Sequence, residues 1–305
     1  MTGTESQSES DPGGELPPSD AFAVLGNETR LRALAALLED GTPTTRSFSE
    51  LAAASGADTT AGFAYHLRQL TGRYLRELAD GYTLTDAGTR VARAARAGVY
   101  TDSVDREPVP VEDPCPFCGE RSLEAGARDN TVSMVCTACD RTLFRLPFPP
   151  GGFRSHADEA LPTALDRLYR SRVALLTEGS CPDCGGAASA SVRTVGVEDA
   201  GWTTGAGERP QLRLRCGACG YGLRCPVTLS VLDHPAVVAF YHEHGVDLRE
   251  RPIWNVGEEW REQLLSSEPL AVRVSTALEG DGLELFVARD GSVVESRRFD
   301  ARGTP

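Results

Sequence analysis

Eight of the nine cysteines in this 305-residue sequence fall into four pairs, each with two residues between its members. The pairs are Cys115 and Cys118, Cys136 and Cys139, Cys181 and Cys184, and Cys216 and Cys219. A Cys-x-x-Cys turn presents two thiolates to one metal ion, and two such turns complete the tetrahedral four-thiolate site that Zn²⁺ prefers. The sequence therefore predicts two structural zinc ions per chain as its cofactors.

The spacing of the pairs indicates the structure around them. There are 17 residues between the first two pairs and 31 between the last two. Strand-forming residues flank each second pair, at 132–135, 142–146, 212–215 and 221–223, as in a zinc ribbon. Four thiolates leave no open position for water, so catalytic zinc is not expected. An iron–sulfur cluster and thioredoxin-like redox chemistry would use the same residues. Two Cys-x-x-Cys turns at the spacing of a zinc ribbon favour zinc over both alternatives.

Cys225 lies outside the four pairs. The favoured prediction for this residue is a buried apolar thiol in a strand, and the alternative is a redox-responsive or ligand-responsive thiol.

The C-terminal part contains three histidines, His234, His242 and His244. They have two interpretations: a second metal site, or a helix with polar ends. His242 and His244 are two residues apart and do not share a helix face, which favours the second alternative. The segment after residue 226 shows no nucleophile–base pair, phosphate loop or paired catalytic acids. We therefore do not expect an enzyme.

The first hundred residues contain no cysteine and follow a different pattern. Their apolar spacing, capping residues and Asp80-Gly81 turn predict helix, short helix, helix, β-hairpin and helix. The expected helices cover 20–41, 47–55, 59–70 and 86–97, and the hairpin strands cover 74–78 and 82–85. This order is typical of a winged helix-turn-helix.

The segments LGNETRLRALAAL, FSELAAASG, TAGFAYHLRQL and GYTLTDAG resemble the arsenic-repressor (ArsR-type) winged-helix family, especially its haloarchaeal members. The resemblance covers residues 19–100. It implies a recognition helix at 59–70 in the major groove of double-stranded DNA, and a homodimer. Members that sense soft metals carry cysteines in this domain, and this sequence has none there, so metal sensing by that route is not expected.

The expected recognition helix has two faces. Phe63, Leu67 and Leu70 point toward the first helix and should be buried. The outward residues, which we expect to contact DNA, are Ala61, Gly62, Tyr65, Arg68 and Gln69. Arginine can donate to guanine and glutamine can read adenine. The alternative is an ordinary solvated helix face.

Three further residues border this helix. Arg73 and Arg76 lie at the wing and are suited to phosphate contacts. His66 lies nearer the core edge of the helix, where packing or bracing is favoured over a DNA contact.

The charge distribution is uneven. All 31 basic residues are arginines, against 44 acidic residues, and the net charge is -13. An acidic, lysine-free composition resembles that of proteins from extreme halophiles, whose molar salt screens self-repulsion. Residues 19–100 carry nine acidic residues and nine arginines, so the segment assigned to DNA is less acidic than the remainder.

These patterns together predict a multidomain α+β protein. The expected parts are a disordered tail (1–18), a winged helix-turn-helix (19–100), a linker (101–113), zinc ribbon 1 (114–147), a helical connector (148–178), zinc ribbon 2 (179–226) and a C-terminal helix with three strands (227–305). Neither a secretory signal nor a run of about 18 apolar residues is found, so a soluble cytoplasmic protein with no membrane partner is expected.

The expected function is sequence-specific DNA binding in transcriptional regulation, with structural zinc ribbons. The alternative is a zinc-ribbon scaffold or nucleic-acid-processing factor that binds protein or RNA. The expected role of the C-terminal half is either dimerisation or the binding of an effector or a protein partner. Its tryptophans, Trp202, Trp254 and Trp260, either line a pocket or pack in the core.

Overall fold

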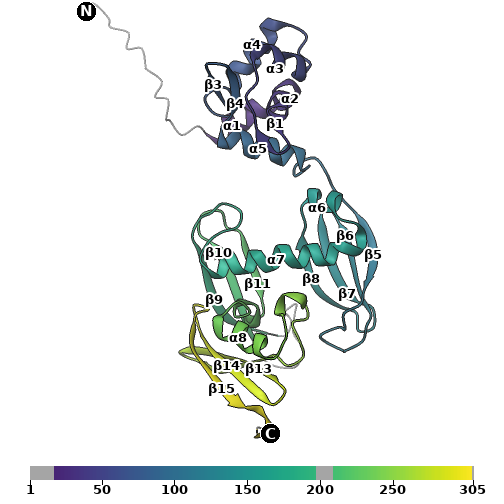
Figure 1. Ribbon diagram of the computed structural model, residues 1–305, viewed down its shortest axis with the longest axis vertical. Coiled ribbons are helices and arrows are strands. Elements are labelled where there is room, and N and C mark those ends of the chain that lie inside the picture. The colour runs from purple at the N-terminus through teal and green to yellow at the C-terminus, as the bar shows by residue number, and fades with distance from the viewer. Residues whose placement is uncertain (1–16, 197–208, 304–305) are drawn as a thin grey trace, which may run out of the picture. The chain divides into compact units, whose positions relative to one another are not determined.

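The computed structural model describes residues 17–196 and 209–303, and the chain divides into two compact units between Asp102 and Ser103. Helices and small antiparallel sheets are mixed in the α+β manner (Figure 1). Of the expected tail, residues 1–16 lie outside the described part, as does Trp202, while Pro18 already begins the first helix. Among the described residues, no helix is both long and apolar enough to cross a membrane.

The first unit is mainly helical. Its elements are α1 (Pro18–Leu25), α2 (Glu28–Ala36), β1 (Leu38–Glu39), β2 (Thr42–Pro43), α3 (Phe48–Ser55), α4 (Thr60–Leu70), β3 (Leu75–Leu78), β4 (Gly81–Leu84) and α5 (Asp86–Arg96). The single helix expected over 20–41 is therefore wrong. The chain breaks at Gly26, and the Asn27 side chain accepts a hydrogen bond from the Arg30 N–H at 3.2 Å to cap a second helix. Asparagine favours such N-caps over helix interiors.

Side-chain caps begin α3 and α4 at the expected places. Ser47 and Glu50 form a reciprocal capping box at the start of α3, and Gly56 ends α3 with a left-handed φ of 67°. Thr59 then caps α4 by accepting a hydrogen bond from the Gly62 N–H at 3.1 Å. These local bonds set where α4 begins and leave it separated from α3 by a short turn.

The β3–β4 hairpin is held against the segment that precedes α3. Arg46 and Tyr82 exchange backbone hydrogen bonds of 3.1 and 2.9 Å. A Cβ atom at Gly81 would lie 2.3 Å from the Arg46 carbonyl oxygen, and the φ of this residue is 148°. Only glycine fits here, which explains the Asp80-Gly81 pair at the hairpin turn.

The second unit contains three antiparallel sheets joined by helices. Its helices and strands are β5 (Arg106–Val111), β6 (Leu123–Arg128), β7 (Thr131–Cys136), β8 (Arg141–Pro147), α6 (Pro150–Ser155), α7 (Leu161–Thr177), β9 (Ala188–Val195), β10 (Arg209–Cys216), β11 (Gly222–Cys225), α8 (Pro235–Glu243), β12 (Arg261–Ser267), β13 (Leu270–Leu278), β14 (Asp281–Ala288) and β15 (Val293–Asp300). The sheet orders are β5-β6-β7-β8, β11-β10-β9 and β12-β13-β14-β15.

Two predicted segments are corrected here. The expected linker at 101–113 contains β5, which pairs with β6 at the edge of its sheet. Prolines at 108 and 110 suggested a linker, yet an edge strand tolerates residues that cannot donate a backbone hydrogen bond. The C-terminal segment has four strands, because β12 precedes the three that were expected. Strand β12 was not predicted because its composition is polar. It is an edge strand, and many of its side chains are exposed.

One hydrophobic core runs through the whole second unit. Helix α7 buries Leu165, Tyr169, Val173 and Leu176 on one face, and the Tyr169 hydroxyl donates to the Pro147 carbonyl at 2.7 Å. This helix extends from the β5–β8 sheet to the β9–β11 sheet (Figure 1). The boundaries expected at 147, 178 and 226 therefore do not separate compact units.

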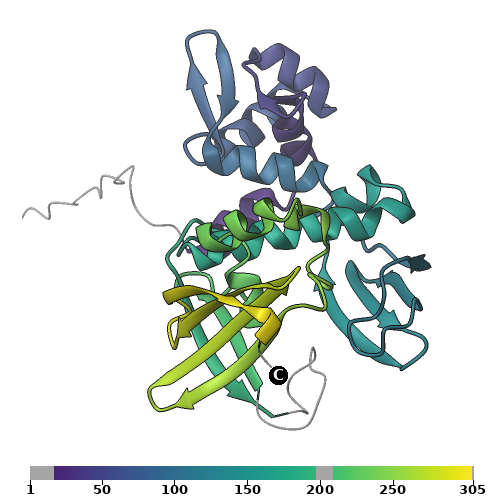
Figure 2. The same cartoon turned by 60° about the horizontal axis from the view of Figure 1, so that its bottom comes forward.

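The β9–β11 and β12–β15 sheets lie side by side over this core (Figure 2). A backbone hydrogen bond of 2.7 Å from the Val192 N–H to the Arg289 carbonyl joins them. Trp254 and Trp260 are buried in the core, and each also borders a hollow, so both alternatives for these two tryptophans apply. Trp260 stacks on Tyr241 with 5.7 Å between ring centroids.

The capping geometry predicts a local effect of Thr59→Ala. Loss of the cap should destabilise the first turn of α4 by about 1 kcal/mol, because the Gly62 N–H loses its acceptor. Amide hydrogen exchange in the full chain should therefore be several-fold faster in this turn. The matched control is Thr60→Ala, because Thr60 is exposed and its side chain makes no hydrogen bond within the described residues. Equal exchange in the two variants would contradict the capping role.

Candidate metal centres and nucleic-acid interface

Two sets of four cysteines converge in the second unit. In cluster 1 (Cys115, Cys118, Cys136, Cys139), the first pair lies in the turn before β6 and the second at the end of β7 and in the turn after it. The Sγ–Sγ distance is 3.9 Å between Cys115 and Cys139 and 3.7 Å between Cys118 and Cys136.

Cluster 2 (Cys181, Cys184, Cys216, Cys219) repeats this arrangement between α7 and β11. The Sγ–Sγ distance is 3.7 Å between Cys181 and Cys219 and 3.6 Å between Cys184 and Cys216. In both clusters two sulfurs belong to buried residues, and cluster 2 has two exposed cysteines, Cys184 and Cys219.

The distances distinguish metal sites from disulfides. All nine cysteines are free, and the four sulfurs of each cluster lie within 4.8 Å of one another. A disulfide requires about 2.05 Å between sulfurs. A tetrahedral ion with metal–sulfur bonds of about 2.3 Å requires an edge of about 3.8 Å. The two clusters could therefore hold two metal ions.

Backbone amides of each second turn favour the thiolate of its first cysteine, Cys136 or Cys216, whereas the pKa of the second cysteine, Cys139 or Cys219, is raised to about 12. In cluster 2, the pKa of Cys216 is lowered to about 6, because the Cys219 N–H donates to its sulfur and so does the Ala218 N–H at 3.3 Å. In cluster 1, burial raises the pKa of Cys136, but the N–H groups of Cys139 and Ala138 outweigh it and the pKa falls to about 7. Metal ligation requires the thiolate, so these turns prepare two ligands for it.

An arginine on α7 holds the turns of cluster 2. The Arg172 guanidinium donates to the Tyr221 hydroxyl at 2.5 Å and pairs with Asp183 at 3.4 Å. Asp183 lies inside the first Cys-x-x-Cys turn of this cluster, and Tyr221 follows the second. Sequence patterns did not indicate Arg172, because its two partners lie far from it along the chain.

Cys225 belongs to neither cluster. It lies in β11 and is 5% exposed, so the predicted buried thiol is confirmed. Burial, with a smaller contribution from the negative charge of Glu262, raises the pKa of the thiol to about 12. A protonated and buried thiol is a poor nucleophile.

Two of the three histidines, His234 and His244, contact the backbone of α8. His234 caps α8 by accepting a hydrogen bond from the Ala236 N–H at 3.2 Å. His244 Nδ1 lies 2.8 Å from the Phe240 carbonyl oxygen, and His242 is exposed. Within the described ranges, no metal-ligand group includes them. The interpretation as a helix with polar ends is favoured.

Helix α4 carries the expected inward and outward faces. Phe63, Leu67 and Leu70 are at most 3% exposed and pack in the core of the first unit. The outward residues are exposed at Ala61, Tyr65, Arg68 and Gln69 and half-buried at Gly62. The side chains that could read bases therefore face solvent together.

His66 lies at the edge of this face and contacts the helices behind it. Its Nδ1 is 3.3 Å from an Arg30 guanidinium nitrogen. Arg30 also donates to the backbone carbonyls of Ala23 and Val24, at the end of α1. The arrangement favours a bracing role for His66, as expected.

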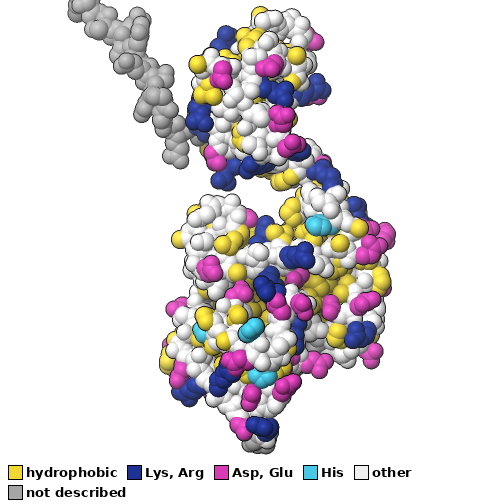
Figure 3. Space-filling view, viewed as in Figure 1, with side chains coloured by type: hydrophobic (Ala, Val, Ile, Leu, Met, Phe, Trp, Pro, Cys, Tyr) yellow, Lys and Arg dark blue, Asp and Glu magenta, His cyan; other side chains and the backbone are white. Residues whose placement is uncertain are grey.

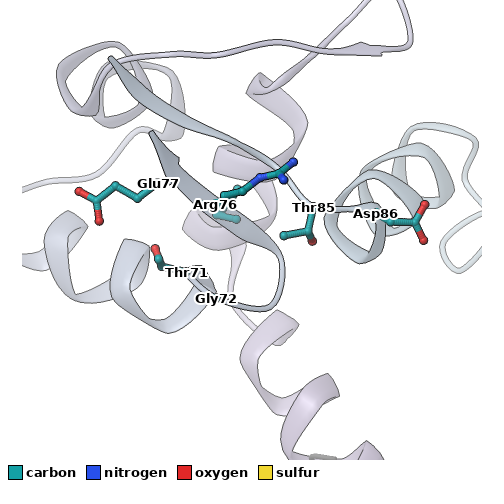
Figure 4. A pocket seen from close by; sticks show the side chains of 7 residues that line it. Thr71, Gly72, Arg76, Glu77, Thr85 and Asp86 are labelled. Carbon is teal, nitrogen blue, oxygen red and sulfur yellow. The ribbon is translucent and has the colours of Figure 1, made fainter. Parts of the chain in front are cut away.

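The two wing arginines differ. Arg73 is half-buried, and its Nε is buried without a hydrogen-bond partner in the described part of the chain. Arg76 is exposed on β3 and lines a hollow of about 300 Å³ together with Thr71, Thr85 and Asp86. Figure 4 shows Arg76 and Glu77 projecting to different sides of the hairpin. Arg76 is the better placed of the two for a phosphate.

The clusters predict the metal content of variants. The full chain should bind two metal ions, and Cys136→Ser should retain one, because three thiolates hold the ion far less well. Cys225→Ala removes a cysteine outside both clusters and should still retain two ions. Elemental analysis of the purified proteins measures this, and an equal loss in both variants would contradict the assignment.

The buried thiol predicts how alkylation depends on pH and folding. With a pKa of about 12, Cys225 should be almost entirely protonated at pH 8 in the folded chain and should not react with iodoacetamide. Unfolding restores a pKa near 8.5, so the reaction should appear in urea. Burial of the neutral thiol also stabilises the fold below the unfolded pKa, and this contribution is lost as the pH rises above it. Mass spectrometry locates the modified residue, and rapid labelling of Cys225 without denaturant would disprove its inertness.

Comparison with known proteins relates both units to families. Residues 18–95 match a domain of unknown function (DUF7347), which corresponds to the first unit. Residues 112–293 match another domain of unknown function (DUF7351), which spans both cysteine clusters and most of the C-terminal sheet. No curated protein and no solved structure matches the chain. Because the second match covers more than half of the 305 residues, the chain belongs to the family of the domain of unknown function DUF7351.

Proposed function

We propose that this protein is a sequence-specific DNA-binding transcriptional regulator, with an ArsR-type winged helix-turn-helix in its first unit. The outward face of α4 carries the proposal. Tyr65, Arg68 and Gln69 are exposed there, while the other side of the helix is anchored in the core. An α-helix fits the major groove, where arginine and glutamine can make bidentate contacts with guanine and adenine.

The elements around α4 support the same function. Helix α3 is capped at Ser47 and ends at a left-handed Gly56, so α4 begins after a short turn. This order is that of a helix-turn-helix, in which the second helix enters the groove. The β3–β4 hairpin follows as the wing, with the exposed Arg76 available for the phosphate backbone.

The charge of the first unit permits binding to DNA without strong non-specific attraction. Its nine arginines balance nine acidic residues over 19–100. On the face seen in Figure 3, acidic side chains are interspersed among the arginines of this unit. Specificity would then depend on base contacts from α4 more than on net charge.

We also propose that the metal ions are Zn²⁺ and that the two sites are structural zinc ribbons. The sulfur–sulfur distances of 3.6–3.9 Å suit one tetrahedral ion and are too short for a cluster of several irons. Each cluster uses all its sulfurs as ligands, which leaves no position for a reacting water. The ions would hold the strand ends together and would take no part in a reaction. Mononuclear iron has similar geometry, and elemental analysis separates it from zinc.

A homodimer is part of this proposal. A groove of about 460 Å³ between α2 and α5 is lined by Leu31, Ala35, Ala92 and Ala95, with charged side chains at its rim. Leu31 is 37% exposed, although other residues of α2 are buried in the core of the first unit. Two copies joined through such a surface would present two α4 helices to a two-fold symmetric site.

The alternative of a scaffold or nucleic-acid-processing factor rests on the second unit, which is the larger of the two. Genome-wide occupancy separates these functions. Discrete peaks at promoters would support regulation, and a signal that follows transcripts would support the alternative.

Variants of α4 and of the wing should behave differently. Arg68→Ala or Gln69→Ala should reduce discrimination between the bound sequence and single-base variants by about 1–3 kcal/mol, because base contacts are lost. Arg76→Ala should weaken all duplexes nearly equally, since phosphates carry no sequence information. Binding titrations with matched duplexes measure both effects. Full selectivity in the α4 variants would refute this assignment of the recognition face.

A further inference from the structure

The outer side of the β9–β11 sheet carries a group of arginines that the proposed function does not use. Along β10, Pro210, Leu212, Leu214 and Cys216 are buried, so the alternate residues point away from the core. Arg213 is half-buried and Arg215 is exposed on this outer side.

The strand register adds two arginines from the neighbouring strands. Arg213 lies opposite Arg224 of β11, and Gln211 lies opposite Arg193 of β9. Residues directly opposite one another in a ladder share a face of the sheet. Arg193, Arg213, Arg215 and Arg224 therefore form one surface, named here the arginine face.

The arginine face lacks the acidic partners found elsewhere in the second unit. Among the described residues, none of its four guanidinium groups has an ion pair or a side-chain hydrogen bond. By contrast, Arg249, Arg297 and Arg302 are paired with Asp247, Glu295 and Asp300.

Such a concentration of positive charge has a structural cost. Like charges directly opposite on neighbouring strands, as at Arg213 and Arg224, destabilise a sheet. The chain has 44 acidic residues and a net charge of -13, so acidic residues were plentiful for pairing. The unpaired group points to an anionic partner.

The surface is also hollowed. Arg213, Arg215 and Arg224 line a hollow of about 330 Å³ with Gly220 and Gly222. A Cβ atom at Gly222 would lie 2.6 Å from the Leu214 carbonyl oxygen, so no side chain can occupy that position without a shift. The guanidinium groups thus border an open recess in which an anionic oxygen group fits.

We propose that the arginine face binds the phosphate backbone of double-stranded DNA, as a contact additional to that of α4. Guanidinium groups match phosphate geometry better than any other side chain. Arg213 and Arg215 are two residues apart on one strand, which spaces them by about 6.7 Å and permits contacts with separate phosphates. The choice of duplex DNA as the partner rests on the proposed function of the first unit.

Among the described residues, the arginine face offers no aromatic ring on which a base could stack, and this favours a duplex over a single strand. Single-stranded nucleic acid is held mainly by bases that stack on aromatic rings. Tyr221, the aromatic residue closest in sequence to β11, has the Arg172 guanidinium 5.0 Å from its ring centroid and a hydrogen bond at its hydroxyl. The strands of this sheet contain no aromatic residue. The face is therefore suited to the outside of a duplex, without sequence preference.

The test compares two triple variants of the full, metal-loaded chain. Arg213→Gln/Arg215→Gln/Arg224→Gln removes the arginine face, and Arg249→Gln/Arg297→Gln/Arg302→Gln makes the same change in net charge at exposed, acid-paired positions. Fluorescence anisotropy with a mixed-sequence duplex, over a range of potassium chloride concentrations, gives the affinity and its salt dependence. Metal content and circular dichroism check that both variants are folded.

Each phosphate contact contributes about 0.9 to the slope of log affinity against log salt. The arginine-face variant should therefore lose up to about 3 from this slope and at least about tenfold in affinity at low salt, whereas the control keeps both. Equal slopes in the two variants would overturn the inference. A loss confined to a single-stranded probe of the same sequence would also overturn it, in favour of a different ligand.

The variant Arg68→Ala/Gln69→Ala separates this inference from the proposed function. If it keeps sequence selectivity while the arginine-face variant loses salt dependence, the role of α4 fails and the arginine face stands. If it loses selectivity and the arginine-face variant matches its control, the role of α4 stands and the arginine face fails. A parent chain that binds no duplex at any salt concentration would overturn both.

Discussion

Four sulfur atoms meet within 4.8 Å at each cysteine cluster, and much of the second unit is arranged to bring them there. Strands β7 and β10 each end on a cysteine, and the partner turn in each case precedes the strand that pairs with that strand, β6 in cluster 1 and β9 in cluster 2. Backbone amides point at the sulfurs, and Arg172 fastens both turns of cluster 2 to α7. Since unpaired thiolates at this distance repel one another, an ion between them would supply much of the stability of these turns.

The clusters do not act as separate modules. Helix α7 packs against both cysteine-bearing sheets, and the C-terminal sheet completes the same core. The first unit has its own core of buried leucines and Phe63 and contains no cysteine, so we expect loss of the ions to leave its stability unchanged.

Charge is placed differently in the two units. Residues 19–100 balance nine arginines with nine acidic residues, and the recognition chemistry proposed for the first unit depends on a few side chains of α4. In the second unit most described ion pairs join arginines to nearby acids, and the arginine face departs from this pattern. The exception is informative because the overall composition is acidic, and net charge alone would not have indicated an anion-binding surface.

Sequence alone determined the features that depend on local chemistry. The four Cys-x-x-Cys turns, the Asp80-Gly81 hairpin and the inward side of α4 follow from residue type and short-range spacing, and the structure has them as expected. The tertiary structure decided what depends on distant partners. Proline-containing β5 and polar β12 become strands because neighbouring strands supply their hydrogen bonds. Arg172 finds its partners across the fold, and the arginine face exists only through the register of three strands. Such contacts leave no periodic trace in the sequence, since they join residues on different elements of the fold.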